Sequence, residues 1–341
     1  MFEEGKLRMK TISNYAGLRV DYVQGGGGNT SYKFNDQLMA IKASGYTLKE
    51  VEEEAGYVTV DYAKIKDQYA SLMENENVDV EKETLAINLE SINLLEGMDN
   101  LRPSVEVGFH SYLPRAVVHT HSVCSNLLCC SEEGRDTAKK IFGVSEFGYI
   151  YIPFINPGYM LSMHIKDEVA VFKAKNGKLP DLIFMESHGI IASNDDFERA
   201  MEIHEKANQM IIDHFSATAF PIASIKKTED GVFSDTPFIH DFIMNFSADN
   251  KYFDEVILYP DQMVYLAGNL GKTIIVDKKN NTIQYKVTEK LAQTIEELIL
   301  GVAYIISEIS RNDLTLKLLC DEGIDFIRNW ESEKYRASLV K

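Results

Sequence analysis

Residues 102–128, RPSVEVGFHSYLPRAVVHTHSVCSNLL, contain the pattern on which the fold prediction depends. An apolar run, residues 116–118, leads directly into His119, Thr120 and His121. β-branched residues in such a run favour a strand. On a strand, residues i and i+2 point to the same face, so His119 and His121 would lie side by side. Two neutral imidazoles on one face form half of a site for a divalent metal, although two structural histidines on a half-buried strand would show the same pattern.

A third histidine, His188, lies in a second apolar segment, residues 182–191, which we expect to be a strand with a polar interruption. Three protein ligands and one open position are typical of a catalytic metal, because the open position accepts a substrate oxygen. Glu106 is close enough to His119 in sequence to reach the same cleft. A carboxylate beside a metal can act as ligand, as base, or as both in turn.

A glycine-rich segment, residues 25–28, is followed by Asn29 and two hydroxyl residues. Glycine lets the backbone approach a ligand closely, and such a loop can present amide groups to an anion such as phosphate; a flexible turn is the alternative. The segment matches neither the P-loop nor the dinucleotide pattern GxGxxG. A predicted strand over residues 38–41 is followed by Lys42, Ser44 and Gly45. These residues would also suit the binding of a phosphate or a sugar hydroxyl.

The bulk composition narrows the class of protein. The chain has 341 residues, 45% hydrophobic and 26% charged, which is ordinary for one large globular domain or two. A net charge of -17 argues against nucleic acid and anionic membrane as partners. The four cysteines form no CxxC pair and do not indicate a disulfide framework. With no signal peptide and no bilayer-spanning run visible, we expect a cytoplasmic protein.

The remaining sequence predicts further elements and a soft boundary near residue 250. The first dozen residues have a mixed pattern without clear structure, residues 76–100 look like a surface excursion, and residues 221–249 look like a loop. Asn194 is the expected N-cap of a helix that runs to about residue 215. After residue 250 we expect three strands and a long amphipathic helix, at residues 256–258, 273–276, 282–285 and 287–309.

Five motifs in this order, GGGNTS, KASG, PSVE, VVHTHS and ESHGI, resemble the class II aldolase/adducin family over about residues 15–215. The long form with PSVE is most similar to the aldolase half of bifunctional rhamnulose-1-phosphate aldolase/dehydrogenase proteins. We expect the dehydrogenase half to be absent, since no GxGxxG occurs. The resemblance implies a three-layer α/β/α fold with a central, mainly antiparallel sheet. Residues 1–250 would form the metal-dependent catalytic domain, and residues 251–341 an α+β C-terminal extension packed on it.

The resemblance also implies roles for individual residues. It implies a zinc ion, or another divalent transition metal, on His119, His121 and His188, with Glu106 as the acid/base. In the smaller aldolases a Ser-Ser-Glu triplet stands where this chain has Ser104-Val105-Glu106, so one hydroxyl is missing here. Those enzymes use a tyrosine as proton donor, which the sequence does not place. The implied phosphate pocket comprises Gly28, Asn29, Ser44, Gly45 and Ser104, and the unranked tyrosine candidates are Tyr149, Tyr151 and Tyr159.

The implied activity is retro-aldol cleavage of a ketose 1-phosphate, such as rhamnulose or fuculose 1-phosphate, to dihydroxyacetone phosphate and an aldehyde. The partner would be a small-molecule sugar phosphate, and the protein a homo-oligomer, most simply a tetramer. The same chemistry supports 4-epimerisation of a pentulose phosphate or dehydration of a thioribulose phosphate. An adducin-like scaffold without catalysis is a third alternative, against which the three histidines and Glu106 argue.

Overall fold

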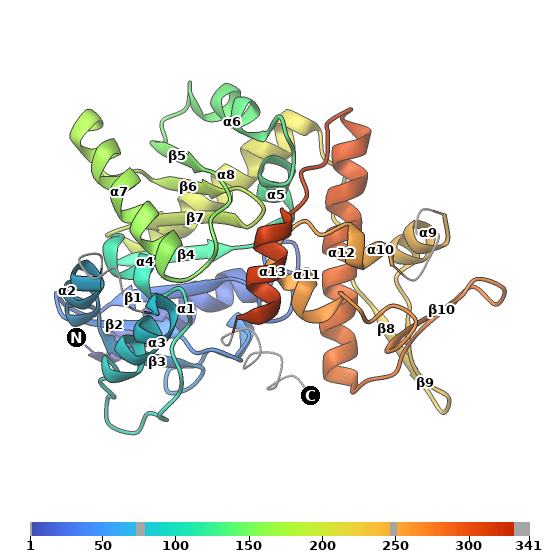
Figure 1. Ribbon diagram of the computed structural model, residues 1–341, viewed down its shortest axis with the longest axis horizontal. Helices are drawn as coiled ribbons and strands as arrows, with labels where there is room; N and C mark the ends of the chain where they lie inside the picture. The colour runs from blue at the N-terminus through green and yellow to red at the C-terminus, as the bar shows by residue number, and fades with distance from the viewer. Residues whose placement is uncertain (1, 73–78, 246–250, 331–341) are drawn as a thin grey trace.

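The computed structural model describes residues 2–72, 79–245 and 251–330, which contain two sheets (Figure 1). The larger sheet has the strand order β3-β2-β1-β4-β7-β6-β5. Its neighbouring strands are antiparallel except β5 and β6, so the prediction of a mainly antiparallel central sheet is confirmed. Its strands are β1 (Asn29–Lys33), β2 (Leu38–Lys42), β3 (Tyr57–Asp61), β4 (Ala116–Thr120), β5 (Tyr149–Ile152), β6 (Leu182–Met185) and β7 (Gly189–Asn194).

Strand β4 lies in the middle of this sheet, and all five of its residues are buried. Its apolar, β-branched run suits a strand covered on both faces. The pairing with β1 sets Asn29 opposite His119, and the pairing with β7 sets Ile191 opposite the same histidine. The register of these three neighbouring strands therefore brings the start of β1, the end of β4 and the start of β7 together at one end of the strands.

Helices cover both faces of the sheet and make three layers (Figure 1). Side chains alternate along the strands: Ile183 of β6 packs in the core on one face, and Phe184 in the core on the other. One face is covered by α1 (Phe2–Gly17), α5 (Val123–Cys129), α6 (Gly134–Phe142) and α8 (Phe197–Phe215), and the other by α2 (Tyr62–Leu72), α3 (Val80–Glu90), α4 (Val107–Tyr112) and α7 (Tyr159–Asn176). The predicted α/β/α fold is confirmed.

The C-terminal part packs beside these layers through a long helix, α12 (Glu289–Arg311). Leu128 of α5, Ile211 of α8 and Leu300 of α12 belong to one continuous buried cluster. A second sheet has the order β10-β11-β9-β8. The elements of this part are β8 (Ile225–Thr228), β9 (Gly231–Ser234), α9 (Pro237–Asn245), α10 (Tyr252–Glu255), α11 (Pro260–Tyr265), β10 (Ile274–Asp277), β11 (Thr282–Tyr285), α12 and α13 (Asp321–Asn329).

The division of the chain at residue 250 stays a prediction. Strand β9 pairs with β11, so the smaller sheet takes strands from both sides of residue 250. This pairing groups β8 and β9 with the C-terminal extension. An extension that began just after α8 would keep the smaller sheet whole.

Several local predictions were wrong. Residues 2–17 form helix α1, whose buried Met9, Ile12 and Ala16 follow a helical spacing. Residues 221–249 contain β8, β9 and α9 rather than a loop, and residues 256–258 form no strand. The predicted surface excursion, of which residues 76–78 lie outside the described residues, includes helix α3, capped by Asp79, and is not contradicted by it.

The two histidine-bearing segments also differ from a simple strand. Residues 182–191 form β6, a tight turn and the start of β7, with His188 in the turn. His121 lies one residue beyond the end of β4.

The N-cap of α8 is Asp196 instead of Asn194, because its carboxylate accepts hydrogen bonds from the amides of Glu198 and Arg199.

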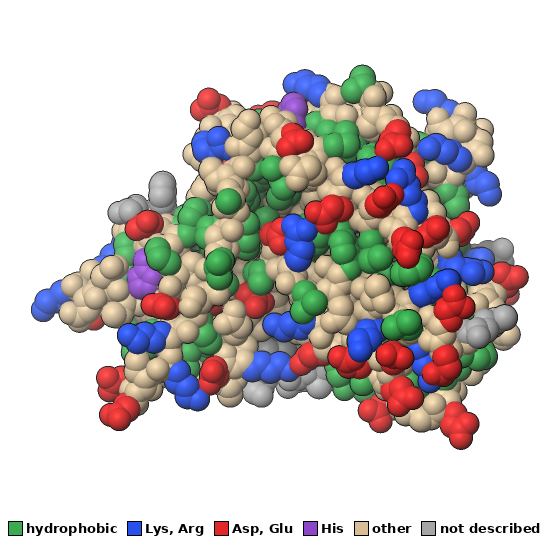
Figure 2. Space-filling view, turned by 180° about the vertical axis from the view of Figure 1, so that it is seen from behind, with side chains coloured by type: hydrophobic (Ala, Val, Ile, Leu, Met, Phe, Trp, Pro, Cys, Tyr) green, Lys and Arg blue, Asp and Glu red, His purple; other side chains and the backbone are tan. Residues whose placement is uncertain are grey.

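The surface carries interspersed acidic and basic side chains, as the face in Figure 2 shows. Among the described residues, no helix is both long enough and apolar enough to cross a membrane.

Candidate metal centre and pocket

Three histidines converge at one end of the central strands of the larger sheet. His119 comes from β4, His121 from the residue after that strand has ended, and His188 from the turn between β6 and β7. Their ring centroids are 5.0–5.1 Å apart, and each offers a nitrogen within 4.8 Å of the other two. All three side chains are buried. The structure thus brings together the three histidines that the sequence singled out.

Close contact between the β6–β7 turn and β4 brings His188 to this place. Ser187 adopts the left-handed conformation, with φ 49°, and so turns the chain sharply before His188. A Cβ at Gly189 would lie 2.2 Å from the carbonyl oxygen of Thr120. Only glycine permits this approach, which explains the glycine that follows His188.

Two of the imidazoles are oriented by hydrogen bonds that their Nδ1 atoms donate. His119 Nδ1 donates to the carbonyl of Ile190 at 3.0 Å, and His121 Nδ1 donates to Asp261 Oδ2 at 2.6 Å. Each Nε2 then carries a lone pair. Both Nε2 atoms are buried without a hydrogen-bond partner among the described residues. Buried polar atoms are rarely left unpaired, so these nitrogens fit a divalent ion as their missing partner.

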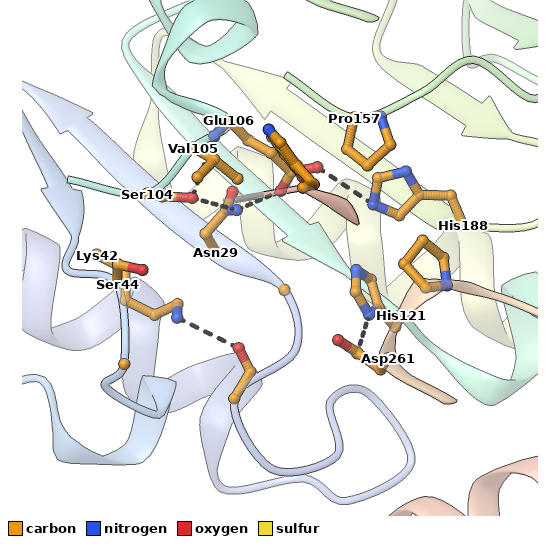
Figure 3. A pocket seen from close by; sticks show the side chains of 15 residues that line it. Asn29, Lys42, Ser44, Ser104, Val105, Glu106, His121, Pro157, His188 and Asp261 are labelled. Atoms are coloured by element: carbon orange, nitrogen blue, oxygen red, sulfur yellow. Dashed lines mark hydrogen bonds and ion pairs between the residues drawn. The ribbon is translucent and has the colours of Figure 1, made fainter. Parts of the chain in front are cut away.

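Glu106 faces the same point from the start of α4 (Figure 3). Its Oε1 lies 3.2 Å from His188 Nε2, and its Oε2 lies 3.5 Å from His119 Nε2. A carboxylate and an imidazole lone pair repel each other at this distance. The approach is favourable only when a positive centre, either a proton or a metal ion, lies between them. Three histidines and one carboxylate therefore surround a common space.

Burial and charge set the protonation states of these groups. Burial lowers the pKa of His119 well below its usual value, which keeps this imidazole neutral and able to bind a metal. Burial by itself would raise the pKa of Glu106, but a positive centre held between it and the imidazoles of His119 and His188 outweighs burial and keeps that pKa well below its usual value. Glu106 is thus an ionised, buried carboxylate.

Asn29 links Glu106 to the interior of the protein. Its Nδ2 donates to Glu106 Oε2 at 2.5 Å and to Ser104 Oγ at 3.1 Å. Its Oδ1 accepts a hydrogen bond from Nε2 of His110, whose Nδ1 in turn accepts from Ser31 Oγ at 2.7 Å. Burial lowers the pKa of His110 to about 3, so it stays neutral in this chain of hydrogen bonds. The sequence interpretation missed His110, which lies in α4 one helical turn after its N-cap, Glu106.

One pocket contains all five residues of the predicted phosphate site, together with Glu106 and two of the histidines. In Figure 3, Lys42 and Ser44 lie on the opposite side of the pocket from His121 and His188. His119 is fully buried and does not line the pocket. The lining residues are Gly26, Gly28, Asn29, Lys42, Ser44, Gly45, Ser104, Val105, Glu106, His121, Pro157, His188, Pro260, Asp261 and Trp330.

The glycine-rich segment forms one wall of the pocket. Gly28 has φ +64°, and a Cβ there would lie 2.7 Å from the carbonyl oxygen of His119. Lys42 is buried, and its Nζ donates to the carbonyls of Gly26 at 3.3 Å and Tyr46 at 2.8 Å. The Lys42 ammonium group and the glycine-rich segment, which packs closely on the backbone of β4, thus both border the space between the histidines and Ser44.

Three lining residues come from the C-terminal part and were missed by the sequence interpretation: Pro260, Asp261 and Trp330. None of them lies in a motif that signals a site. Among the described residues that line this pocket, none of the three tyrosine candidates is found. The hydroxyls of Tyr151 and Tyr159 donate instead to the backbone carbonyls of Leu128 and Tyr69.

The fold and this site define the class of protein, and comparison with known proteins agrees. Residues 14–211 match the family described as the class II aldolase and adducin N-terminal domain, so the chain belongs to that family. Class II aldolases typically depend on a divalent metal, which the buried histidine triad can hold.

Individual relatives match part of the chain. The uncharacterized oxidoreductase YuxG of Bacillus subtilis (strain 168) is 26% identical over 218 residues, which cover 60% of this chain and 29% of that relative. The N-terminal class II aldolase domain of a conserved protein from Thermoplasma acidophilum has a TM-score of 0.50 and 21% identity, with coverage of 61% and 92%. The L-fuculose-1-phosphate aldolase from Thermus thermophilus has a TM-score of 0.38 and 13% identity, with coverage of 63% and 95%.

Proposed function

We propose that this protein is a metal-dependent aldolase that cleaves a ketose 1-phosphate to dihydroxyacetone phosphate and an aldehyde. One observation carries the proposal: an ionised, buried Glu106 faces three histidines across the floor of a pocket whose other side presents Lys42 and Ser44. A proton-transfer group, a metal site and an anion site are the three parts that such a reaction needs.

His119, His121 and His188 would hold the metal, and zinc is the proposed ion because an imidazole set with a nearby carboxylate suits it. When bound, a divalent ion supplies Lewis-acid stabilisation of negative charge on substrate oxygen. Glu106 would move the proton at the carbon next to the substrate carbonyl: it removes this proton in the condensation direction and returns it in the cleavage direction.

The remaining pocket residues would bind and orient the substrate. Lys42 brings positive charge, and Ser44 and the amides around Gly28 and Gly45 can donate hydrogen bonds to a phosphate. Asn29 and Ser104 are hydrogen-bonded to each other, and Asn29 also donates to Glu106, so we propose that these two residues position the acid/base as well as line the phosphate site.

Four apolar residues also line the pocket and would contact the aldehyde end of the substrate: Val105, Pro157, Pro260 and Trp330. A methyl-terminated product such as lactaldehyde suits this lining better than a fully hydroxylated one, because a hydroxyl buried against apolar side chains loses the hydrogen bonds that it makes with water. We therefore propose rhamnulose or fuculose 1-phosphate as the substrate class. The homotetramer and the cytoplasmic location stay predictions.

A panel of ketose phosphates tests the proposal. Zinc-loaded protein is incubated with rhamnulose, fuculose, fructose and ribulose 1-phosphates and with a pentulose 5-phosphate, and release of dihydroxyacetone phosphate is measured. We expect release from a 6-deoxyketose 1-phosphate, its loss after chelation and its return with added Zn²⁺. Epimerisation of the pentulose phosphate without any release from the panel would replace the aldolase by the epimerase. No reaction with any of these substrates by zinc-loaded protein would overturn the proposal.

A further inference from the structure

One carboxylate from the C-terminal part of the chain contacts a histidine of the metal site. Asp261 lies in α11, and its Oδ2 accepts the 2.6 Å hydrogen bond from His121 Nδ1 that Figure 3 shows. Both side chains are buried. The two residues are 140 positions apart, and the family match ends at residue 211, so membership in the family does not imply this contact.

The contact selects one state of the imidazole. A carboxylate oxygen can only accept, so the hydrogen of His121 stays on Nδ1 and the lone pair stays on Nε2. The opposite tautomer would set a lone pair against the Asp261 carboxylate and would leave a buried N–H without an acceptor. A carboxylate that accepts from Nδ1 also makes Nε2 a stronger base and therefore a better metal ligand.

The glycine-rich loop packs directly on this pair of side chains. A Cβ at Gly27 would lie 2.5 Å from Asp261 Oδ2 and 3.0 Å from His121 Nδ1. The loop is itself attached to the C-terminal part, because the amide of Gly25 donates to Glu297 Oε2 of α12 at 3.1 Å. The hydrogen bond from His121 to Asp261 is thus enclosed between α11 and a loop that α12 holds in place.

We propose that Asp261 is a positioning residue of the metal site, which holds His121 with its Nε2 directed at the ion and thereby raises the affinity for a divalent metal. The C-terminal part of the chain is in this respect a component of the metal centre, since it supplies the group that orients one ligand. The inference rests on the metal site of the proposed function and is independent of which substrate is cleaved.

Metal affinity tests this inference directly. The full chain is stripped of metal and titrated with Zn²⁺ in competition with a chromophoric chelator, for wild type, Asp261→Ala and Asp261→Asn. Asp254→Asn is the matched control, because the Asp254 carboxylate accepts from the amide of Gly268 in the same segment and is exposed. We expect Asp261→Ala to weaken binding about 10–100-fold, the usual range for a lost partner of a metal ligand. Asp261→Asn should weaken it less, since the amide oxygen still accepts from Nδ1, and the control should leave it unchanged.

A double-mutant cycle separates positioning from a general structural role. In a His121→Ala background, Asp261→Ala should cause no further loss of affinity, because the residue it orients is gone. The absorption spectrum of the Co²⁺-loaded protein should change in Asp261→Asn but not in the control. Unchanged Zn²⁺ affinity in both Asp261 variants, or equal losses in the two backgrounds, would overturn the inference. A wild-type protein that binds no Zn²⁺ would overturn the proposed function together with it, so the two failures are distinguishable.

Discussion

Replacing Glu106 with glutamine separates proton transfer from every other role of this side chain. Glu106 accepts from Asn29 Nδ2 at 2.5 Å and approaches His188 Nε2 at 3.2 Å. The amide of a glutamine has nearly the same shape, so its oxygen can still accept from Asn29. It has no basic oxygen with which to take a proton. Glu106→Gln should therefore keep the fold and the metal, since all three histidines remain, but lose catalysis.

The expected effects differ in size. Proton transfer by a positioned side chain contributes about 10²–10⁴ in rate, which corresponds to ~3–5 kcal/mol of transition-state stabilisation. The structural cost is smaller: a buried hydrogen bond to a charged group becomes one to a neutral group, a loss of about 1–2 kcal/mol in the free energy of unfolding. Turnover should thus fall at least about a hundredfold in protein that is still folded at room temperature.

The assay is turnover per bound metal with the best substrate of the panel, alongside metal content and urea unfolding. Substrate binding can be followed separately, because the single tryptophan of the chain, Trp330, lines the pocket and its fluorescence should respond. Glu186→Gln is the control: Glu186 is close in sequence to His188 but pairs with Lys317 outside the pocket. A Glu106→Gln enzyme with turnover within a few-fold of wild type would refute Glu106 as the acid/base.

Three further predictions concern the metal, the glycine loop and pH. As purified, the protein should hold about one divalent ion per chain, and His119→Ala with His121→Ala should abolish it in elemental analysis; full occupancy in the double variant would move the site elsewhere. Gly28→Ala should lower the free energy of unfolding by at least about 1–2 kcal/mol, because φ is +64° and a Cβ would lie 2.7 Å from the His119 carbonyl oxygen. The control in urea unfolding is Gly97→Ala, where φ is +83° and a Cβ would meet no atom within 4 Å, so that its loss of stability comes from φ alone. Burial lowers the pKa of His204 from 6.5 to about 3, so between these values the unfolded chain binds the extra proton. The free energy of unfolding should therefore fall as pH drops below 6.5, by up to about 1.4 kcal/mol per pH unit, and His204→Gln should reduce that slope in urea unfolding at pH 7, 6 and 5; an unchanged slope would contradict it.

The sequence by itself determined the central strand and its chemistry. The β-branched run before His119 predicts β4, and the spacing of the two following histidines predicts their proximity, because strand geometry repeats every two residues. Helix α12 was equally predictable, since its apolar residues recur at helical spacing over many turns. Short or weakly periodic elements such as β8, β9 and α3 were not, because their patterns are too brief to distinguish from loops.

Only the tertiary structure decided how the site is completed. His188 reaches the metal site from a turn, through the pairing of β7 with β4 and the approach of Gly189 to Thr120. His110 and Asp261 are 81 and 140 residues away from the groups that they contact, Asn29 and His121. Periodicity describes which way a side chain points within its own element, whereas contacts between distant segments depend on how whole elements pack against one another. The histidines that we propose as metal ligands were therefore visible in local patterns, and the groups that orient them were not.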